Sequence, residues 1–250
     1  MRRTLFWYLP LTAALTATAV MGFGFYSFLS GDTGTRIDVT TKPIEVAHPA
    51  AVWPVLLGDS LARGAGDESG LGIGGRFDRE LRRRRIAANP TVNLAINGAK
   101  TNDLIQQLQS RNVLTLVAQA NVVLVSIGGN DLFGSGNWRN GPPPDPSAVM
   151  GSVLGRIEQI IHTIRNANPR ARIFFIGLYN PFVAQRNGRM LSVLVNQWNA
   201  QLQSRFGNDP DVVIVQTSDL FTHHDRLSFD RFHPGDEGYE LIARRIADSF

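Results

Sequence analysis

Residues 121–127, with the sequence NVVLVSI, decide the fold, and Gly128-Gly129-Asn130-Asp131 follows them directly. The run is rich in β-branched residues and contains no charge, which is typical of a strand buried on both faces. Such strands occur in parallel sheets that helices cover on both sides. We therefore expect a parallel strand at 121–127, with polar groups at its carboxyl end.

The rest of the folded part repeats this alternation of apolar runs and amphipathic segments. Further strands are predicted at 52–57, 91–96, 172–178 and 211–215. Apolar residues recur at helical spacing in the predicted helices 75–88, 101–118, 147–165, 191–206 and 236–249. Strands that alternate with helices, without an internal repeat or linker, predict one α/β domain over residues 52–250 with a five-stranded parallel sheet.

The composition narrows the class of protein. Of the 250 residues, 43% are hydrophobic, which is enough for a packed core and excludes wholesale disorder. The absence of cysteine excludes disulfides, thiolate metal sites, a cysteine nucleophile and a lipid-modified cysteine. The net charge of +4 is carried mostly by arginine, and we expect no nucleic-acid partner.

An apolar segment opens the chain. No charge follows Arg3 until Asp32, and residues 5–29 are long enough to span a bilayer as a helix. An uncleaved membrane anchor fits this length better than a cleaved signal peptide, whose small-residue site would be Ala17-Thr18-Ala19. Both alternatives predict an extracytoplasmic domain. The expected parts are a signal anchor or signal peptide at 1–30, a polar tether at 31–51 and the folded domain at 52–250.

Chemically useful side chains lie at the ends of predicted strands. Ser60 follows the first strand, within Gly58-Asp59-Ser60-Leu61, where a tight turn would expose its hydroxyl. A serine becomes a nucleophile when a base takes its proton, and the base needs an orienting acid. His233 is the predicted base, because Asp230 precedes it by three residues and can reach its Nδ1–H. The Nε2 atom would then face Ser60.

Two further histidines lie near the end of a predicted strand. His223 and His224 remain rival bases, and Asp225 remains a rival acid. A metal site at these residues is not expected, because no further ligands follow at a recognisable spacing. We expect no cofactor.

Three donors are predicted for the oxyanion that acyl transfer creates. They are the backbone N–H of Ser60, the backbone N–H of Gly98 and the side-chain amide of Asn130. Gly98 suits this role because a residue without Cβ lets a substrate approach the backbone. Asn130 suits it because a neutral amide donates a hydrogen bond without titrating.

The blocks around Ser60, Gly98, Asn130 and His233, in this order, resemble the SGNH hydrolase family, the GDSL-type esterases and lipases. They extend over residues 58–233, nearly the whole folded part. Stretches similar to bacterial extracytoplasmic members are 57–64, 66–70, 127–133 and 179–182. The resemblance implies a flavodoxin-like three-layer α/β/α sandwich and metal-free ester hydrolysis through an acyl-serine intermediate. It does not choose among lipid, glycan and small aryl esters.

We therefore expect a serine ester hydrolase with Ser60, His233 and Asp230 as its triad, anchored to the bacterial membrane or secreted. The alternative is a non-catalytic envelope module that binds an acylated sugar or lipid on the same fold. A monomer is the working expectation for the oligomeric state. Residues 133–146 are expected to form either a rim or lid at the substrate, or an ordinary connection between a strand and a helix.

Overall fold

The computed structural model describes residues 2–29, 51–134, 145–222 and 224–250. The chain divides into two compact units, Met1–Ala47 and His48–Phe250. Helix α1, Arg2–Leu29, belongs to the first unit. In the described part of the chain, no helix is both long and apolar enough to cross a membrane, so the expected membrane anchor gains no support here. The predicted tether lies outside the described residues except for Ala51.

The second unit is built on a five-stranded sheet. Its strands are β1 (Pro54–Gly58), β2 (Val92–Asn93), β3 (Val122–Ser126), β4 (Arg172–Ile176) and β5 (Val212–Val215). Every neighbouring pair is parallel, and the order across the sheet is β2-β1-β3-β4-β5. The prediction of a five-stranded parallel sheet is confirmed, and the order is that of flavodoxin-like folds.

Strand β2 is shorter than the predicted 91–96. The chain still follows β1, since the N–H of Leu94 donates to Leu56 and that of Ile96 to Gly58, at 2.8 and 2.9 Å. The Asn93 side chain accepts from the N–H of Ala95 at 3.0 Å and so competes with a regular ladder. The strand therefore ends early while its path continues along β1.

The larger helices overlap the predicted segments, but the helix predicted at 75–88 ends at Arg83 and the one predicted at 101–118 is divided. The helices after α1 are α2 (Ser60–Arg63), α3 (Gly72–Arg83), α4 (Thr101–Gln107), α5 (Arg111–Gln119), α6 (Gly129–Phe133), α7 (Pro146–Ala167), α8 (Gly188–Phe206) and α9 (Asp236–Asp248). The single helix predicted at 101–118 is two, because Ser110 leaves the helical conformation and caps α5 in an extended one. Helix α6 and the 3₁₀ turns Ser218–Phe221 and His224–Arg226 were not predicted.

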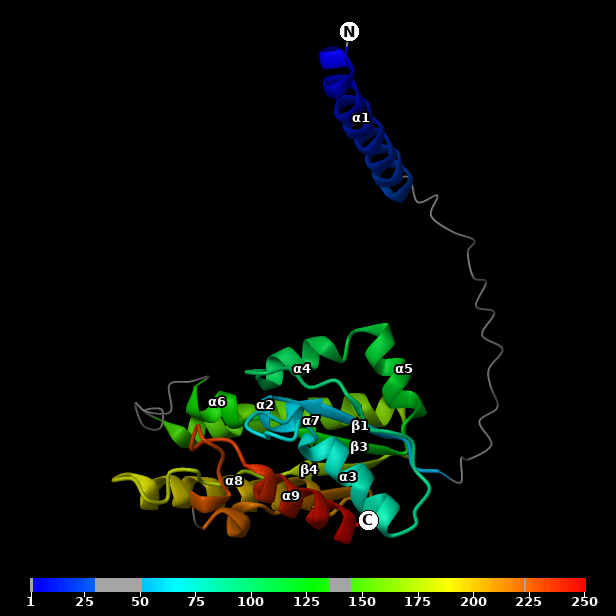
Figure 1. Ribbon diagram of the computed structural model, residues 1–250. Coiled ribbons are helices and arrows are strands. Elements are labelled where there is room, and N and C mark those ends of the chain that lie inside the picture. The colour runs from blue at the N-terminus through cyan, green and yellow to red at the C-terminus, as the bar shows by residue number, and fades with distance from the viewer. Residues whose placement is uncertain (1, 30–50, 135–144, 223) are drawn as a thin grey trace. The chain divides into compact units, whose positions relative to one another are not determined.

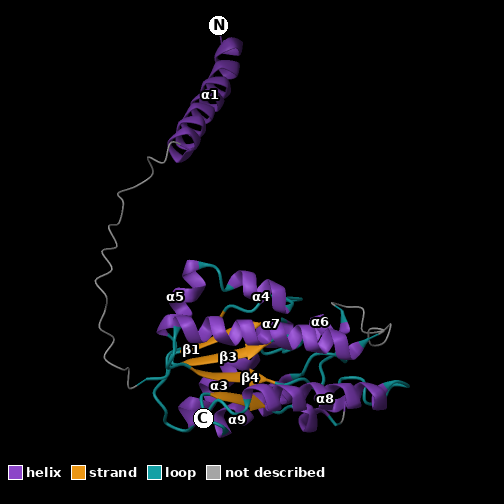
Figure 2. Cartoon of the chain, turned by 180° about the vertical axis from the view of Figure 1, so that it is seen from behind, coloured by secondary structure: helices purple, strands orange, loops and turns teal. Residues whose placement is uncertain are grey.

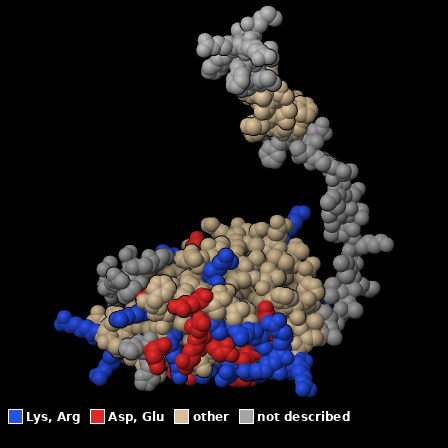
Figure 3. Space-filling view, in the orientation of Figure 1, with Lys and Arg blue, Asp and Glu red and all other residues tan. Residues whose placement is uncertain are grey.

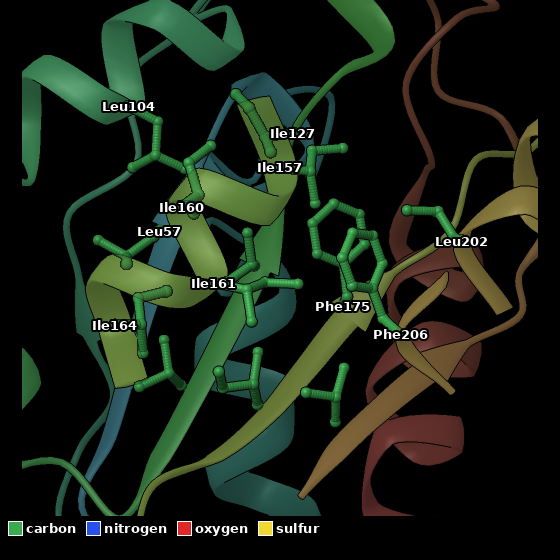
Figure 4. Packing of buried hydrophobic residues seen from close by; sticks show 14 of the residues in the cluster. Leu57, Leu104, Ile127, Ile157, Ile160, Ile161, Ile164, Phe175, Leu202 and Phe206 are labelled. Atoms are coloured by element: carbon green, nitrogen blue, oxygen red, sulfur yellow. The ribbon is translucent and has the colours of Figure 1, made fainter. Parts of the chain in front are cut away.

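Helices cover both faces of the sheet (Figures 1 and 2). Alternate strand residues such as Leu57, Val125 and Phe175 pack under α4, α5, α7 and α8. Their neighbours Leu56 and Phe174 pack under α3 and α9. Figure 4 shows the first of these two cores, where the isoleucines of α7 point toward the strands. The second unit thus has three layers, and all five strands end at the same edge of the sheet.

The arginine run at 82–85 belongs to the α3 and α9 face. Arg83 and Arg84 both pair with the buried Glu80, at 2.5 and 3.7 Å, and Arg84 also pairs with Asp248. Figure 3 shows acidic and basic side chains side by side over α3 and α9. These pairings partly neutralise the run, as expected of a solvated helix face.

Candidate active site

Ser60 lies where β1 turns into the short helix α2. Gly58 has φ of +135°, and a Cβ atom there would lie 1.9 Å from the carbonyl oxygen of Ser126, so this bend requires glycine. Asp59 then caps α2, because its carboxylate accepts from the N–H of Leu61 at 3.1 Å. Ser60 is therefore the first residue of a helix at the carboxyl end of β1, and its N–H has no partner within that helix.

The loop before α9 holds His233 and Asp230. The N–H of Ser228 donates to the carbonyl of His233 at 2.8 Å and closes the loop. One oxygen of Asp230 accepts from the Ser228 hydroxyl at 2.7 Å and from the N–H groups of Phe232 and His233, both at 2.9 Å. The loop itself thus fixes the Asp230 carboxylate, and its second oxygen remains for His233.

A continuous hydrogen-bonded chain joins Asp230, His233 and Ser60. The His233 Nδ1 atom lies 2.6 Å from Asp230 Oδ2, and its Nε2 atom lies 2.8 Å from Ser60 Oγ. Burial alone would raise the pKa of Asp230, but the hydrogen bonds from His233, Ser228 and the loop N–H groups outweigh burial and lower it to about 2. An ionised carboxylate only accepts, so Nδ1 carries the proton, and Nε2 of the neutral ring accepts from Ser60.

Asn130 lies beside Ser60, at the start of α6. It lines the same pocket as Ser60 and His233, and its amide donates to the carbonyl of Ala99 at 3.0 Å. This bond ties Asn130 to the turn that contains Gly98. Gly98 itself has φ of +77°, is exposed, and has open space where a Cβ atom would lie. Gly98 is not among the described residues that line the pocket. The bond between Asn130 and Ala99 connects its turn to the pocket.

Asp59 is a feature of the site that sequence reasoning missed. Asp59 precedes Ser60 in the chain and is buried, and its carboxyl group accepts from the Ser126 hydroxyl at 3.3 Å as well as from the N–H of Leu61. Burial raises the pKa of Asp59 to about 7, because the hydrogen bonds offset only part of the cost of removing the charge from water. No local pattern could have shown the burial of Asp59, since it depends on the neighbouring strand β3, which carries Ser126.

The pocket in front of Ser60 is mainly apolar. Besides the polar groups already described, its lining includes Phe133, Leu178, Tyr179, Pro181, Phe182, Leu191, Val195 and Phe232. Tyr179 is held against this wall because its hydroxyl donates to the Phe232 carbonyl at 2.7 Å. A substrate that reaches Ser60 therefore meets both hydrocarbon surface and the Asn130 side chain.

The rival residues His224 and Asp225 lie in the 3₁₀ turn His224–Arg226, and neither is among the described residues that line the pocket of Ser60. Asp225 lines a second pocket with Pro181, Phe221 and Leu227. His223 lies outside the described residues, as do residues 135–144 of the predicted rim or lid. Within the described ranges, no group of three or more His, Asp or Glu side chains is placed to hold a metal ion.

Comparison with known proteins places the chain in a family. The model of the GDSL-like lipase/acylhydrolase family matches residues 56–241. The chain belongs to this family. GDSL-like lipases and acylhydrolases are ester hydrolases, and the matched range contains Ser60, Gly98, Asn130, Asp230 and His233.

Individual GDSL-like relatives support the same family and fold. The uncharacterized protein YpmR of Bacillus subtilis is 30% identical over 198 residues, which are 76% of this chain and 78% of YpmR. The spore germination lipase LipC of Bacillus licheniformis is 26% identical over 201 residues, 76% of this chain and 92% of LipC. The lipase Lip_vut3 from a goat rumen metagenome has the same fold, with a TM-score of 0.69 at 22% identity over 80% of this chain and 97% of Lip_vut3.

Proposed function

We propose that this GDSL-like protein hydrolyses carboxylic esters through an acyl-serine intermediate. The observation that carries the proposal is the hydrogen-bonded chain from Asp230 through His233 to Ser60, with contacts of 2.6 and 2.8 Å. A serine, a neutral imidazole and a carboxylate in this order supply a nucleophile, a base and an orienting acid. Family membership supports the same reaction class.

The first half of the reaction forms the acyl-enzyme. Ser60 Oγ attacks the ester carbonyl while its proton passes to His233 Nε2, and the carbonyl becomes a tetrahedral oxyanion. The backbone N–H groups of Ser60 and Gly98 and the amide of Asn130 donate to that oxyanion. When the intermediate collapses, the bond to the alkoxy oxygen breaks and His233 returns the proton to the leaving alcohol. Asp230 holds the imidazolium in orientation throughout.

The second half releases the acid. A water molecule takes the place of the alcohol, and His233 accepts its proton as it attacks the acyl carbonyl. The same three donors hold the second oxyanion. Collapse then breaks the bond to Ser60 Oγ, which regains its proton from His233, and the carboxylic acid leaves. The cycle consumes one water and one ester.

The lining of the pocket supports an apolar acyl group in the substrate. Leu178, Phe182, Leu191 and Val195 form a hydrocarbon wall beside Ser60. Burying methylene groups there stabilises the bound acyl chain by about 0.8 kcal/mol each. We therefore expect activity to rise from acetate to short-chain and medium-chain esters. A rate that is highest for acetyl esters of sugars would contradict this part of the proposal.

The test uses the purified protein and nitrophenyl butyrate. Ser60→Ala should abolish hydrolysis and also abolish labelling by a fluorophosphonate probe, because only an activated serine reacts with it. The control is Ser249→Ala, whose hydroxyl donates to the Arg245 carbonyl at 2.9 Å at the end of α9. A wild-type protein that neither hydrolyses esters nor reacts with the probe would instead favour the non-catalytic binding module.

We also propose that residues 1–30 direct the domain out of the cytoplasm. Arg2 and Arg3 are the only charges in this segment, and they precede a long apolar run. Cell fractionation and the mass of the mature protein test this together. Full-length protein in the membrane fraction indicates an anchor, a shortened protein outside the cytoplasm indicates a cleaved signal, and full-length protein in the cytosol would contradict export.

A further inference from the structure

A partly buried ion-pair network lies next to Asn130 in the chain and takes no direct part in the proposed reaction. It consists of Thr101 on α4, Asp131 on α6 and Arg156 on α7, and we call it the Asp131 network. Thr101 is fully buried, and the side chains of Asp131 and Arg156 are 6% and 27% exposed. Three helices that are separate in the sequence thus meet at one carboxylate.

Each oxygen of Asp131 has a defined partner. Oδ2 accepts from the backbone N–H of Thr101 at 2.9 Å, and Oδ1 accepts from the Thr101 hydroxyl at 2.7 Å. Arg156 Nη2 also donates to Oδ1 at 3.1 Å, and its Nε–H donates to the Thr101 hydroxyl oxygen at 2.6 Å. A further guanidinium N–H donates to Ser152 on the same helix at 2.8 Å. The three side chains therefore form a closed ring of hydrogen bonds.

The network lies close in the sequence to both side-chain and backbone donors predicted for the oxyanion. Asp131 follows Asn130 directly, and Thr101 is three residues after Gly98. Between them, the Asn130 amide donates to the Ala99 carbonyl at 3.0 Å. The loop after β3 and the turn after β2 are thus joined twice, once by Asn130 itself and once by Asp131 behind it.

The double connection restricts how the two blocks can move. The Asn130 bond joins the turn that carries Gly98 to the loop after β3 at one point. The bidentate grip of Asp131 adds a second point, because both the backbone and the side chain of Thr101 are held. Donors to an oxyanion are effective only when their geometry is set before the charge develops.

We propose that Asp131, through Thr101 and Arg156, positions the Asn130 amide and the Gly98 N–H relative to each other. This inference rests on the proposed ester hydrolysis, in which both groups donate to the oxyanion. Asp131 is then a positioning residue: it does not touch the substrate, and it acts through donors that do. Its effect should appear in the transition state and not in substrate binding.

The experiment compares Asp131→Asn with the wild type on nitrophenyl butyrate. We expect kcat to fall by about 10–10²-fold with KM nearly unchanged, because a displaced donor weakens the transition state more than the ground state. Butylboronic acid, which forms a tetrahedral adduct with an activated serine, should bind more weakly by a similar factor. The pH profile should keep its shape, because the bonds of His233 to Asp230 and Ser60 are untouched.

A matched control separates positioning from general stability. Asp209→Asn removes the carboxylate that Arg165 of the same helix α7 reaches at 3.5 Å. Asp209 precedes β5 and therefore lies at the edge of the sheet opposite to the site. Asp209→Asn should leave kcat and boronate affinity at wild-type values. Thr101→Val is a second variant, for use if Asp131→Asn folds poorly. It keeps the shape of the side chain and replaces the hydroxyl by a methyl group. It should lower kcat in the same direction by a smaller factor.

A double-variant cycle gives the sharpest readout. In an Asn130→Ala background the positioned amide is gone, so adding Asp131→Asn should cost less in kcat than it costs in the wild type. Equal costs in both backgrounds, or wild-type kcat in Asp131→Asn and Thr101→Val, would overturn the positioning role while leaving ester hydrolysis intact. An inactive wild-type protein whose Ser60 does not react with a fluorophosphonate would overturn both proposals.

Discussion

The Nε2 atom of His233 lies 2.8 Å from the Oγ atom of Ser60, although 173 positions of the chain separate the two residues. The contact joins the turn after β1 to the loop before α9. Both segments lie at the edge of the sheet where the parallel strands end. Such an edge collects loops that are distant in the sequence, which makes it the usual place for a site in open α/β sheets.

The first prediction concerns the acid that orients His233. Asp230→Asn should lower kcat/KM by up to about 10⁴-fold, because an amide can hold the imidazole in the wrong tautomer. Steady-state hydrolysis of nitrophenyl butyrate at pH 8 measures this effect. Asp225→Asn, which changes the rival acid in the second pocket, should retain wild-type kcat/KM. A large loss in Asp225→Asn and a small one in Asp230→Asn would reverse the assignment of the acid.

The second prediction concerns the pH dependence of stability. Burial raises the pKa of Asp59 from 3.8 to about 7, so between these values the folded state binds a proton that the unfolded state has lost. The contribution of Asp59 is therefore fully present below pH 3.8 and is lost as the pH rises toward about 7. Asp59→Asn should flatten this fall, as urea unfolding at pH 5 and pH 8 would show.

Asp219→Asn is the control for the pH experiment. Hydrogen bonding and ion pairing with Arg245 lower the pKa of Asp219, so its contribution is lost only as the pH falls below the ordinary range for a carboxylate. The change in stability between pH 5 and pH 8 should therefore match that of the wild type. If Asp59→Asn also matches the wild type over this range, Asp59 does not titrate as the structure indicates.

The third prediction concerns the glycine that precedes the nucleophile turn. Gly58→Ala should prevent stable folding, because the new Cβ would lie 1.9 Å from the Ser126 carbonyl oxygen at a φ of +135°. Gly155→Ala, at an open position on α7, should instead stabilise the protein by about 0.5–1 kcal/mol. The free energy of unfolding in urea measures both. A Gly58→Ala protein with wild-type stability would show that the turn can adopt another conformation.

The fourth prediction concerns the acyl wall. Val195→Phe should shift the preferred substrate toward shorter acyl chains, because the larger ring occupies the pocket lined by Val195. Val193→Phe lies on the same helix, but its side chain points to solvent, with 53% of Val193 exposed. The kcat/KM for the butyrate ester divided by that for the octanoate ester should rise only with the first variant. The same ratio in both variants would place the acyl chain elsewhere.

Much of the fold could be predicted because its signals are local. The uncharged run at 121–127 and the helical spacing of apolar residues in 147–165 each depend only on neighbours in the chain, and β3 and α7 lie there. The errors are local as well. Asn93 shortens β2 through its own side chain, and Ser110 divides the helix predicted at 101–118.

The sequence by itself determined which polar groups follow the predicted strands. It also favoured Asp230 as the partner of His233, because a spacing of three residues in a loop is a local property. Their catalytic roles stay predictions. Only the tertiary structure decided that Asp59 is buried and that Asp131 holds Thr101, contacts that depend on β3 and α4 and bridge 67 and 30 positions. Burial and long-range hydrogen bonds are properties of packed elements, and a linear pattern carries no record of which elements meet.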